Sequence, residues 1–369
     1  MANILVIAYD FPPILSPESI QSQRFVLKLL KEGHNVVVLT THTNPDFETI
    51  DTQLLDKKID IIRTKKLFLE KYRHIFYKLL GIVDRKLWWR DIAFKTAKKI
   101  IQKQNINKII TRSVPFSDHI VGYKLKKELN IEWVSHFSDP WSMNPYDKRG
   151  IVFRLIDSYL EKKILHLVDS MSVTSQKTKE LYLQKYKHLN IVIYPHLYEE
   201  ALYKNRKNKS KKIVITHTGN IYGLRSIKKI LEVLKECKRN DIEFRFYGKI
   251  KKEELELVKR WNLEAKVKIF DTISYRDSLD KMKESDYLLV VEAPLENSPF
   301  FPSKLVDYMG AKRPIVLYGV KNSTSFKILE QYTEYFVFID SKDSIKDFLT
   351  KVQKIEYLPI KKQEDLFSL

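Results

Sequence analysis

The sequence is poor in several features that define familiar protein classes. It has a single cysteine among 369 residues, Cys237, so no internal disulfide is possible and we expect this thiol to pack as a small apolar side chain. The first predicted strand is not followed by a Gly-x-Gly-x-x-Gly turn, which disfavours a dehydrogenase-type dinucleotide site. No charge-free window approaches the roughly 18 apolar residues that a membrane span requires.

Metal ligands and export signals are also scarce. No residue cluster has zinc-ligand spacing, and no Asp-x-Asp pair occurs, so an obvious carboxylate pair for a divalent metal is missing. The N-terminus enters a predicted strand at Asn3 without a basic segment, an apolar core and a cleavage site. Because 44% of the residues are hydrophobic, we predict a globular cytoplasmic protein without a bound metal or cofactor.

Positive charge is abundant. The chain has 66 Lys and Arg against 46 Asp and Glu, a formal net charge of +20, which implies an anionic partner such as nucleic acid, anionic lipid or a phosphorylated substrate. Residues 57–103 carry fifteen of the basic residues against four acidic ones, interleaved with aromatics. We favour contact of this section with the inner face of the cell membrane; the alternative is a solvated basic face over an ordinary core.

Predicted strands and helices alternate in two series. The first series has strands at 3–9, 36–40, 59–64, 108–111, 131–137, 171–174 and 191–194, and helices at 17–31, 71–80, 88–101, 116–129, 152–167 and up to about 187. The second has strands at 213–217, 243–247, 267–270, 287–291, 315–318 and 336–339, again with intervening helices. We therefore predict two Rossmann-like domains facing each other across a cleft, which is the expected place for a ligand.

The predicted boundaries follow composition. The N-terminal domain covers 1–196, and a charged segment with few apolar residues marks a linker at 197–212. The C-terminal domain covers 213–352, and 353–369 form a polar tail.

Two strand ends carry the candidate chemistry. After the strand 287–291 a helix is predicted from Pro302 to the residue before Pro314, with Ser303 and Lys304 in its opening turn. A helix start at this edge of a parallel sheet favours an anion such as a diphosphate; the alternative is an ordinary capped helix. The strand 131–137 runs into polar and titratable residues at the same kind of edge, His136-Phe137-Ser138-Asp139-Pro140-Trp141.

Four segments in register resemble one family. The opening Ile4 to Pro13, together with Gly33 to Val38, resembles the N-terminal signature of family-4 glycosyltransferases of the GT-B fold. Three further segments are similar to a bacterial subgroup that makes surface polysaccharides: Ser138-Asp139-Pro140-Trp141, Thr218 to Tyr222 with Arg225-Ser226, and Pro302 to Met309 with Pro314-Ile315-Val316. The resemblance spans essentially the whole chain.

The resemblance implies an α/β enzyme that transfers a sugar from a nucleotide diphosphate sugar, retains the anomeric configuration and needs no essential metal. It places the donor on the C-terminal domain, the acceptor on the N-terminal domain and the ribose near Asp307. The implied donor-binding residues are Thr218, Gly219, Asn220, Arg225, Glu292, Ser303, Lys304, Leu305 and Asp307. The implied acceptor-binding residues are Ser16, Ser138 and Trp141, and the catalytic candidates are Asp139 and His136.

The chain departs from the family pattern at three places. Pro299 stands where the first acid of a Glu-x7-Glu pattern is usual, and Glu292 or Glu296 is the candidate replacement. Ser16-Pro17 replaces the usual Gly-Gly, and Ser138-Asp139 stands where many relatives carry His-Asp. Either His136 or Asp139 is therefore expected to contact the reacting sugar.

The sequence thus predicts a glycosyltransferase acting on a lipid-linked glycan in cell-surface polysaccharide synthesis, such as lipopolysaccharide or capsule. A sugar-nucleotide epimerase of the same architecture is the alternative. A basic nucleic-acid-binding protein is more remote, because no helix-turn-helix, zinc finger or RNP motif is present.

Overall fold

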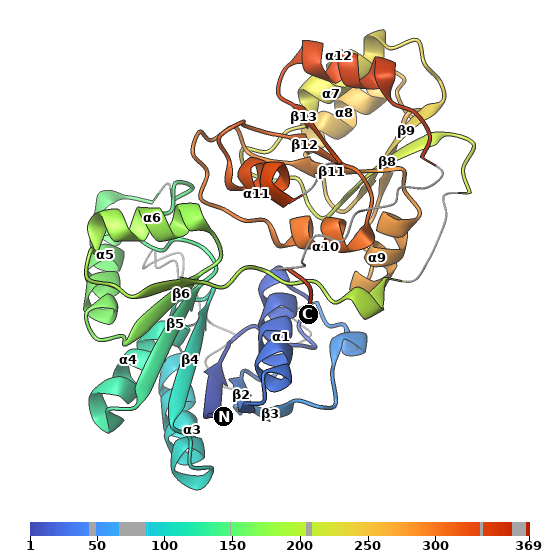
Figure 1. The fold of residues 1–369 in the computed structure, drawn as a ribbon. Helices are drawn as coiled ribbons and strands as arrows, with labels where there is room; N and C mark the ends of the chain where they lie inside the picture. The colour runs from blue at the N-terminus through green and yellow to red at the C-terminus, as the bar shows by residue number, and fades with distance from the viewer. Residues whose placement is uncertain are drawn as a thin grey trace. The chain divides into compact units, whose positions relative to one another are not determined.

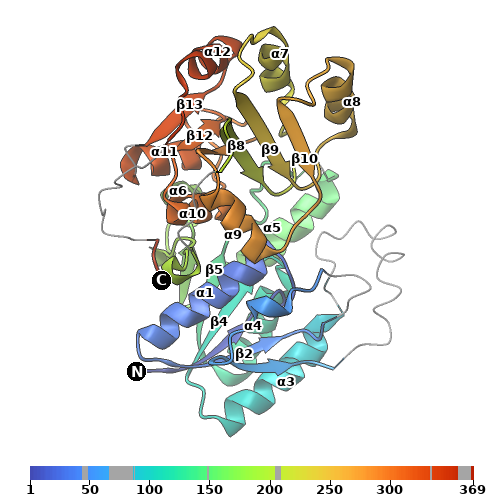
Figure 2. The same cartoon turned by 90° about the vertical axis from the view of Figure 1, so that its right-hand side faces the viewer.

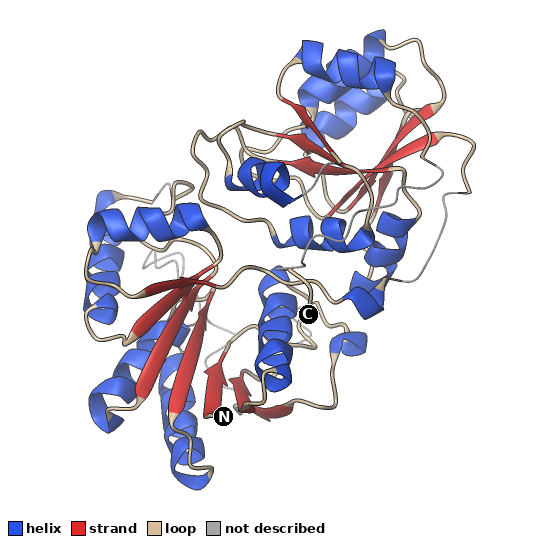
Figure 3. Ribbon diagram, viewed as in Figure 1, coloured by secondary structure: helices blue, strands red, loops and turns tan. Residues whose placement is uncertain are grey.

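The computed structural model describes residues 1–43, 49–65, 86, 88–147, 149–203, 209–332, 335–355 and 367–369. The chain divides into two compact units, Met1–His196 with Leu369 and Leu197–Ser368. Each unit is built on one parallel sheet flanked by helices (Figures 1 and 3). The predicted α/β fold class is confirmed; the predicted helix 71–80 lies outside the described residues.

The sheet of the first unit has seven parallel strands in the order β3-β2-β1-β4-β5-β6-β7. Their bounds are β1 Asn3–Ile7, β2 Asn35–Thr40, β3 Asp60–Arg63, β4 Lys108–Ser113, β5 Glu132–Phe137, β6 Ser170–Val173 and β7 Ile191–Ile193. Strand order reverses between β1 and β4. The carboxyl ends of these two strands therefore frame the place where an open α/β sheet binds ligands.

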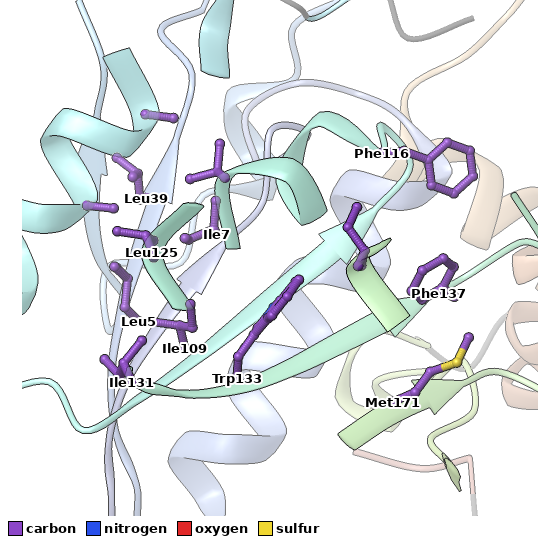
Figure 4. Close-up of a cluster of buried hydrophobic side chains, with 14 of the residues drawn as sticks. Leu5, Ile7, Leu39, Ile109, Phe116, Leu125, Ile131, Trp133, Phe137 and Met171 are labelled. Atoms are coloured by element: carbon purple, nitrogen blue, oxygen red, sulfur yellow. The ribbon is translucent and has the colours of Figure 1, made fainter. Parts of the chain in front are cut away.

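Helices cover both faces of this sheet: η1 Thr52–Leu54, α1 Pro17–Lys31, α3 Trp89–Lys103, α4 Ser117–Leu129, α5 Ile151–Leu165 and α6 Gln176–Lys185. Helix α1 lies on one face, and α3 and α4 lie on the other (Figure 1). Figure 4 shows the core beneath α4, where Leu5, Ile109, Trp133 and Phe137 pack together, all fully buried.

Helix α1 has the predicted bounds for a visible local reason. The Ser16 hydroxyl accepts a hydrogen bond from the Ser19 N–H at 3.0 Å, and Pro17 occupies the first helical position. Gly33 follows the helix with φ of +86°, a conformation that glycine adopts without strain.

The sheet of the second unit has six parallel strands in the order β10-β9-β8-β11-β12-β13. The elements are η3 Glu200–Leu202, β8 Ile213–Thr218, α7 Lys228–Glu236, β9 Ile242–Tyr247, α8 Lys252–Arg260, β10 Val267–Phe270, α9 Tyr275–Lys283, β11 Tyr287–Val291, α10 Ser303–Ala311, β12 Ile315–Tyr318, α11 Thr324–Tyr332, β13 Phe336–Ile339 and α12 Lys342–Lys351. Helices α7, α8 and α12 cover one face, and α9, α10 and α11 lie on the other (Figures 1 and 2). Order reverses between β8 and β11.

Two details differ from expectation. Pro302 stands just outside α10, with ψ of 124°, so the helix begins at Ser303. The end of the predicted polar tail packs against the second unit: Phe367 is 5% exposed, and its carbonyl accepts the Tyr198 N–H at 2.7 Å. Its ring meets Phe301 and Tyr332 edge-on, so an apolar side chain fixes this part of the tail.

The basic section 57–103 is described only in part. In α3, Trp89 is 3% exposed and packs in the core with Ala93, Ala97 and Ile100. Phe94 is partly buried against the same core and Trp88 is half-buried, while Phe68, Tyr72, Phe76 and Tyr77 lie outside the described residues. Within the described ranges, no helix has both the length and the apolar content needed to cross a bilayer.

Candidate functional site

The carboxyl edge of the second sheet brings Lys304 to the loop after β8. Lys304 lies in the first turn of α10, and its Nζ donates a hydrogen bond to the Thr218 carbonyl at 2.7 Å. The same Nζ lies 3.2 Å from His217 Nε2. The structure therefore joins two motifs that are 86 residues apart in the sequence, at the point where strand order reverses.

Glycines allow this close approach. Gly219 has φ of +97°, and a Cβ there would lie 3.0 Å from Lys304 Nζ. Gly248, with φ of +135°, supports the loop from behind, where a Cβ would lie 2.8 Å from the Gly219 backbone. Side chains at either position would strain the backbone and crowd the lysine.

The charge of Lys304 is suppressed at this site. Burial of the ammonium group, and next the positive charge of Arg225, lower its pKa from 10.5 to about 7. The pKa of His217 is lowered well below 6.5, chiefly by burial and then by Lys304. The neutral His217 ring donates from Nδ1 to the Leu289 carbonyl at 2.8 Å, so its Nε2 lone pair faces the lysine. A bound anion would restore the charge of Lys304.

Tyr308 positions the loop and was not predicted from the sequence. Its hydroxyl accepts the Thr218 N–H at 2.9 Å and lies 3.3 Å from the Leu289 carbonyl oxygen. Burial raises the pKa of this hydroxyl to about 12. Its place one turn after Lys304 on α10 is the signal that could have identified it.

Asn220 and Arg225 complete the β8 loop. The Asn220 side chain accepts the Lys249 N–H at 2.8 Å, which ties this loop to the one after β9. The Arg225 guanidinium stacks over the exposed ring of Tyr222 at 4.8 Å and remains half-buried. It is thus held at the edge with its planar fork open to a ligand.

The predicted acidic residues of this unit are placed differently from one another. Glu292 directly follows β11, accepts a hydrogen bond from the Ser325 hydroxyl and lies against Gly319, whereas Glu296 is exposed further along the loop. Asp307 is buried, and its Oδ1 accepts hydrogen bonds from Tyr203 at 3.0 Å and Tyr275 at 2.8 Å. The Asp307 carboxylate thus links η3, α9 and α10.

The other two predicted donor-binding residues of α10, Ser303 and Leu305, lie in different environments. Ser303 opens the helix and is half-buried at the edge. Leu305 is fully buried, and its N–H already donates to the Pro302 carbonyl at 2.9 Å. This placement gives Leu305 a role in the core and does not support contact with a donor.

The carboxyl edge of the first sheet is acidic around one buried arginine. Glu18, in the first turn of α1, pairs with Arg112 at 3.1 Å. Arg112 is 2% exposed, donates from Nε to Ser22 at 2.9 Å and stacks over Phe25. The predicted Ser16 caps α1 and donates to Asp10 at 3.2 Å.

Glu18 is a candidate residue that the sequence analysis missed. Burial raises its pKa from 4.5 to about 7; Arg112 and the neighbouring Ser138 hydroxyl oppose this shift, while Asp139 and Asp10 add to it. A carboxyl group with such a pKa can take a proton from a hydroxyl near neutral pH. An acid directly after Ser-Pro at the start of the first predicted helix was the available signal.

The residues at the end of β5 and in the segment after it divide between the sheet edge and the core. His136 is 1% exposed and lies 2.9 Å from the Ser172 hydroxyl through Nδ1; burial, and next Arg112, hold its pKa well below 6.5. His136 Nε2 is buried and has no hydrogen-bond partner within the described residues. Trp141 is 3% exposed and stacks on Phe116 at 4.6 Å, so its ring builds the core and does not support acceptor binding.

The structure thus gathers the predicted residues at two separate edges. Thr218, Gly219, Asn220, Arg225, Ser303 and Lys304 share the edge of the second unit, and Ser16, Ser138 and Asp139 share that of the first with Glu18. Over the described ranges, no group of three or more His, Cys, Asp or Glu residues is placed to hold a metal ion.

Comparison with known proteins gives no match to a family model and none to the curated proteins. Solved structures do match. A sucrose-phosphate synthase from Thermosynechococcus elongatus superposes with a TM-score of 0.64 at 16% identity, covering 95% of this chain and 90% of that one.

The names of two other similar structures state a bound ligand or an activity. Anabaena HepE in complex with UDP and glucose has a TM-score of 0.63 at 12% identity, with 95% and 90% of the chains covered. The lipopolysaccharide outer core galactosyltransferase WaaB has a TM-score of 0.59 at 13% identity, with 94% and 88% covered. At these identities the similarity concerns the fold alone, and the chain has the GT-B fold.

Proposed function

We propose that this protein is a glycosyltransferase that moves a sugar from a nucleotide diphosphate sugar to a glycan acceptor. The observation that carries the proposal is the half-buried Lys304 held against Gly219 at the β8–β11 switch point of a GT-B chain. The pKa of this lysine is about 7 without a ligand, and a bound anion would raise it and so favour the charged form.

The proposed chemistry follows from the leaving group. Breaking the bond between the anomeric carbon and the phosphate oxygen builds negative charge on the departing diphosphate. Lys304, Arg225 and the α10 N-terminus supply positive charge and N–H donors at one edge, which is the stabilisation such a reaction needs. The reaction is then metal-independent.

The acceptor side is assigned to the first unit. We place an acceptor hydroxyl at the edge formed by Glu18, Ser138 and Asp139, where carboxylates suit hydroxyl donors. Glu18 is the candidate base for the proton of that hydroxyl, and Asp139 and His136 are the other candidates on this unit. Retention of configuration is part of the proposal.

We further propose a lipid-linked glycan acceptor in the synthesis of a cell-surface polysaccharide, with the protein at the cytoplasmic face of the membrane. The name of the similar WaaB, a lipopolysaccharide outer core galactosyltransferase, supports this class of acceptor, as does the net charge of +20.

The test is transfer in vitro. The purified protein is incubated with a panel of nucleotide sugars, with and without lipid-linked acceptors, and the anomeric configuration of the product is read by NMR. We expect transfer from one donor and none with Lys304→Met. A changed sugar nucleotide in the absence of acceptor would identify an epimerase instead, and no binding of any donor would contradict the proposal.

A further inference from the structure

Helix α5 carries its polar groups on the side that faces the protein. Glu161 is fully buried and accepts hydrogen bonds from Tyr182 and Tyr186 at 3.1 Å and from the Ser142 N–H at 2.9 Å. Asp157, also on the inner side, pairs with Arg149. Both carboxylates of the helix are therefore held inward by named partners, which fixes the rotation of α5 about its axis.

The outer side of α5 is apolar as a consequence of this rotation. Its side chains Ile151, Val152, Leu155, Ile156 and Tyr159 are 50–66% exposed. Their spacing of one, three and four residues places them on one stripe about 12 Å long. The other exposed large apolar side chains among the described residues occur singly or in pairs, so this stripe is the exception. Soluble helices usually show the opposite pattern.

Cations accompany the stripe. Lys162 and Lys163 follow it on the exposed side, Lys163 lies 4.5 Å from the centre of the Tyr159 ring, and Arg154 flanks it. No acidic side chain of α5 is exposed. An apolar stripe with basic residues and an aromatic ring is the composition of a helix that lies in the plane of a membrane surface.

We infer that the outer face of α5 docks the protein on an anionic lipid surface, with the five apolar side chains inserted and Arg154, Lys162 and Lys163 at the headgroups. A second copy of the chain fits less well, because all exposed charges on the two paired α5 faces would be positive and would repel one another. The inference places the membrane contact on α5 instead of the basic section 57–103, where the Trp89 ring lies in the core and the Trp88 and Phe94 rings are half-buried. It deepens the proposed function, since a lipid-linked acceptor resides at that surface.

Vesicle sedimentation with the full chain tests the inference. Vesicles of phosphatidylcholine with phosphatidylglycerol should bind the protein, and Leu155→Ser combined with Ile156→Ser should weaken binding by at least about tenfold. Lys162→Gln with Lys163→Gln should weaken it by about fivefold per lysine and reduce its dependence on salt. Leu55→Ser, which removes an exposed leucine outside α5, is the matched control.

The depth to which α5 inserts into the bilayer is a second measurement, and a folding defect would not produce the same result. In Tyr159→Trp, brominated phosphatidylcholine should quench fluorescence beyond the level seen for the native tryptophans. Unfolding temperature and UDP binding should be unchanged in all variants, since the donor edge lies in the other unit.

Three results would overturn the inference: no sedimentation of the wild type with anionic vesicles, equal loss of binding in Leu55→Ser, or a dimer that the α5 substitutions dissociate. Absence of sugar transfer would count against the proposed function alone, because vesicle binding is measured without donor or acceptor.

Discussion

The two sheet edges have opposite electrostatic character although their topology is the same. At the edge of the second unit, Lys304 and Arg225 lie beside a loop shaped by two glycines, and the lysine has a pKa of about 7. At the edge of the first unit, Glu18 is clustered with Asp10 and Asp139 around Arg112, and Glu18 also has a pKa of about 7. One fold plan thus provides one edge suited to a diphosphate and another suited to hydroxyl groups.

Removal of the Lys304 charge should have the largest effect. Lys304→Met should weaken UDP binding by about a hundredfold, because a charge-assisted contact to phosphate is lost inside a partly enclosed site. Calorimetric titration measures this effect. Lys327→Met changes an exposed lysine on α11 and should bind UDP like the wild type. Equal UDP affinities of the wild type, Lys304→Met and Lys327→Met would show that Lys304 does not contact the ligand.

Glu18 should make stability depend on pH. Its pKa is about 7 in the folded protein and 4.5 in the reference state, so the folded state holds an extra proton between these values. The free energy of unfolding should therefore fall by roughly 1–3 kcal/mol from this group as pH rises from 4.5 to 7.

Glu18→Gln should remove that slope in chemical denaturation. Glu32→Gln, at the exposed residue that directly follows the same helix, should keep the slope. A slope that persists in Glu18→Gln would mean that another group titrates there.

The pH dependence of donor binding should distinguish the second edge from the first. A bound diphosphate favours the protonated lysine, so UDP affinity relative to Lys304→Met should fall above pH 7, by at most about tenfold per pH unit. The comparison with Lys304→Met cancels the titration of the nucleotide itself. A constant ratio from pH 6 to 9 would contradict the lowered pKa of Lys304.

Arg225→Ala should have the smallest effect, about fivefold on UDP affinity. The guanidinium is half-buried, which weakens its attraction for phosphate through solvent screening, and its loss relieves the repulsion that lowers the pKa of Lys304. An unchanged unfolding temperature would assign the loss to binding. A larger effect than that of Lys304→Met would reverse the ranking of the two cations.

Much of the fold could be predicted from the sequence, because apolar strands and capped helices alternate clearly. The bounds of α1, β10, β11, β12 and β13 match the predictions, and each has strong local signals such as the Ser16 cap or an unbroken apolar run. Of the site, Lys304 and the β8 loop were predicted from the helix start and the family resemblance.

The other features of the fold and the site could not be predicted, because they depend on the orientation of side chains. The burial of Trp141 and Leu305, the tyrosine partners of Asp307 and the cluster around Glu18 are set by contacts between distant segments. Residue spacing along one element carries no information about such contacts. The exposed stripe of α5 shows the same limit, since its apolar residues suit a core helix equally well until the inward Glu161 contacts are known.

The most direct test of the account compares UDP with uridine as ligands of the wild-type protein by calorimetry. If the edge formed by Gly219, Arg225 and Lys304 is a diphosphate site, UDP should bind at least about a hundredfold more tightly than uridine. Equal affinities for UDP and uridine would contradict it, as would no binding of any nucleoside diphosphate in a panel that includes UDP.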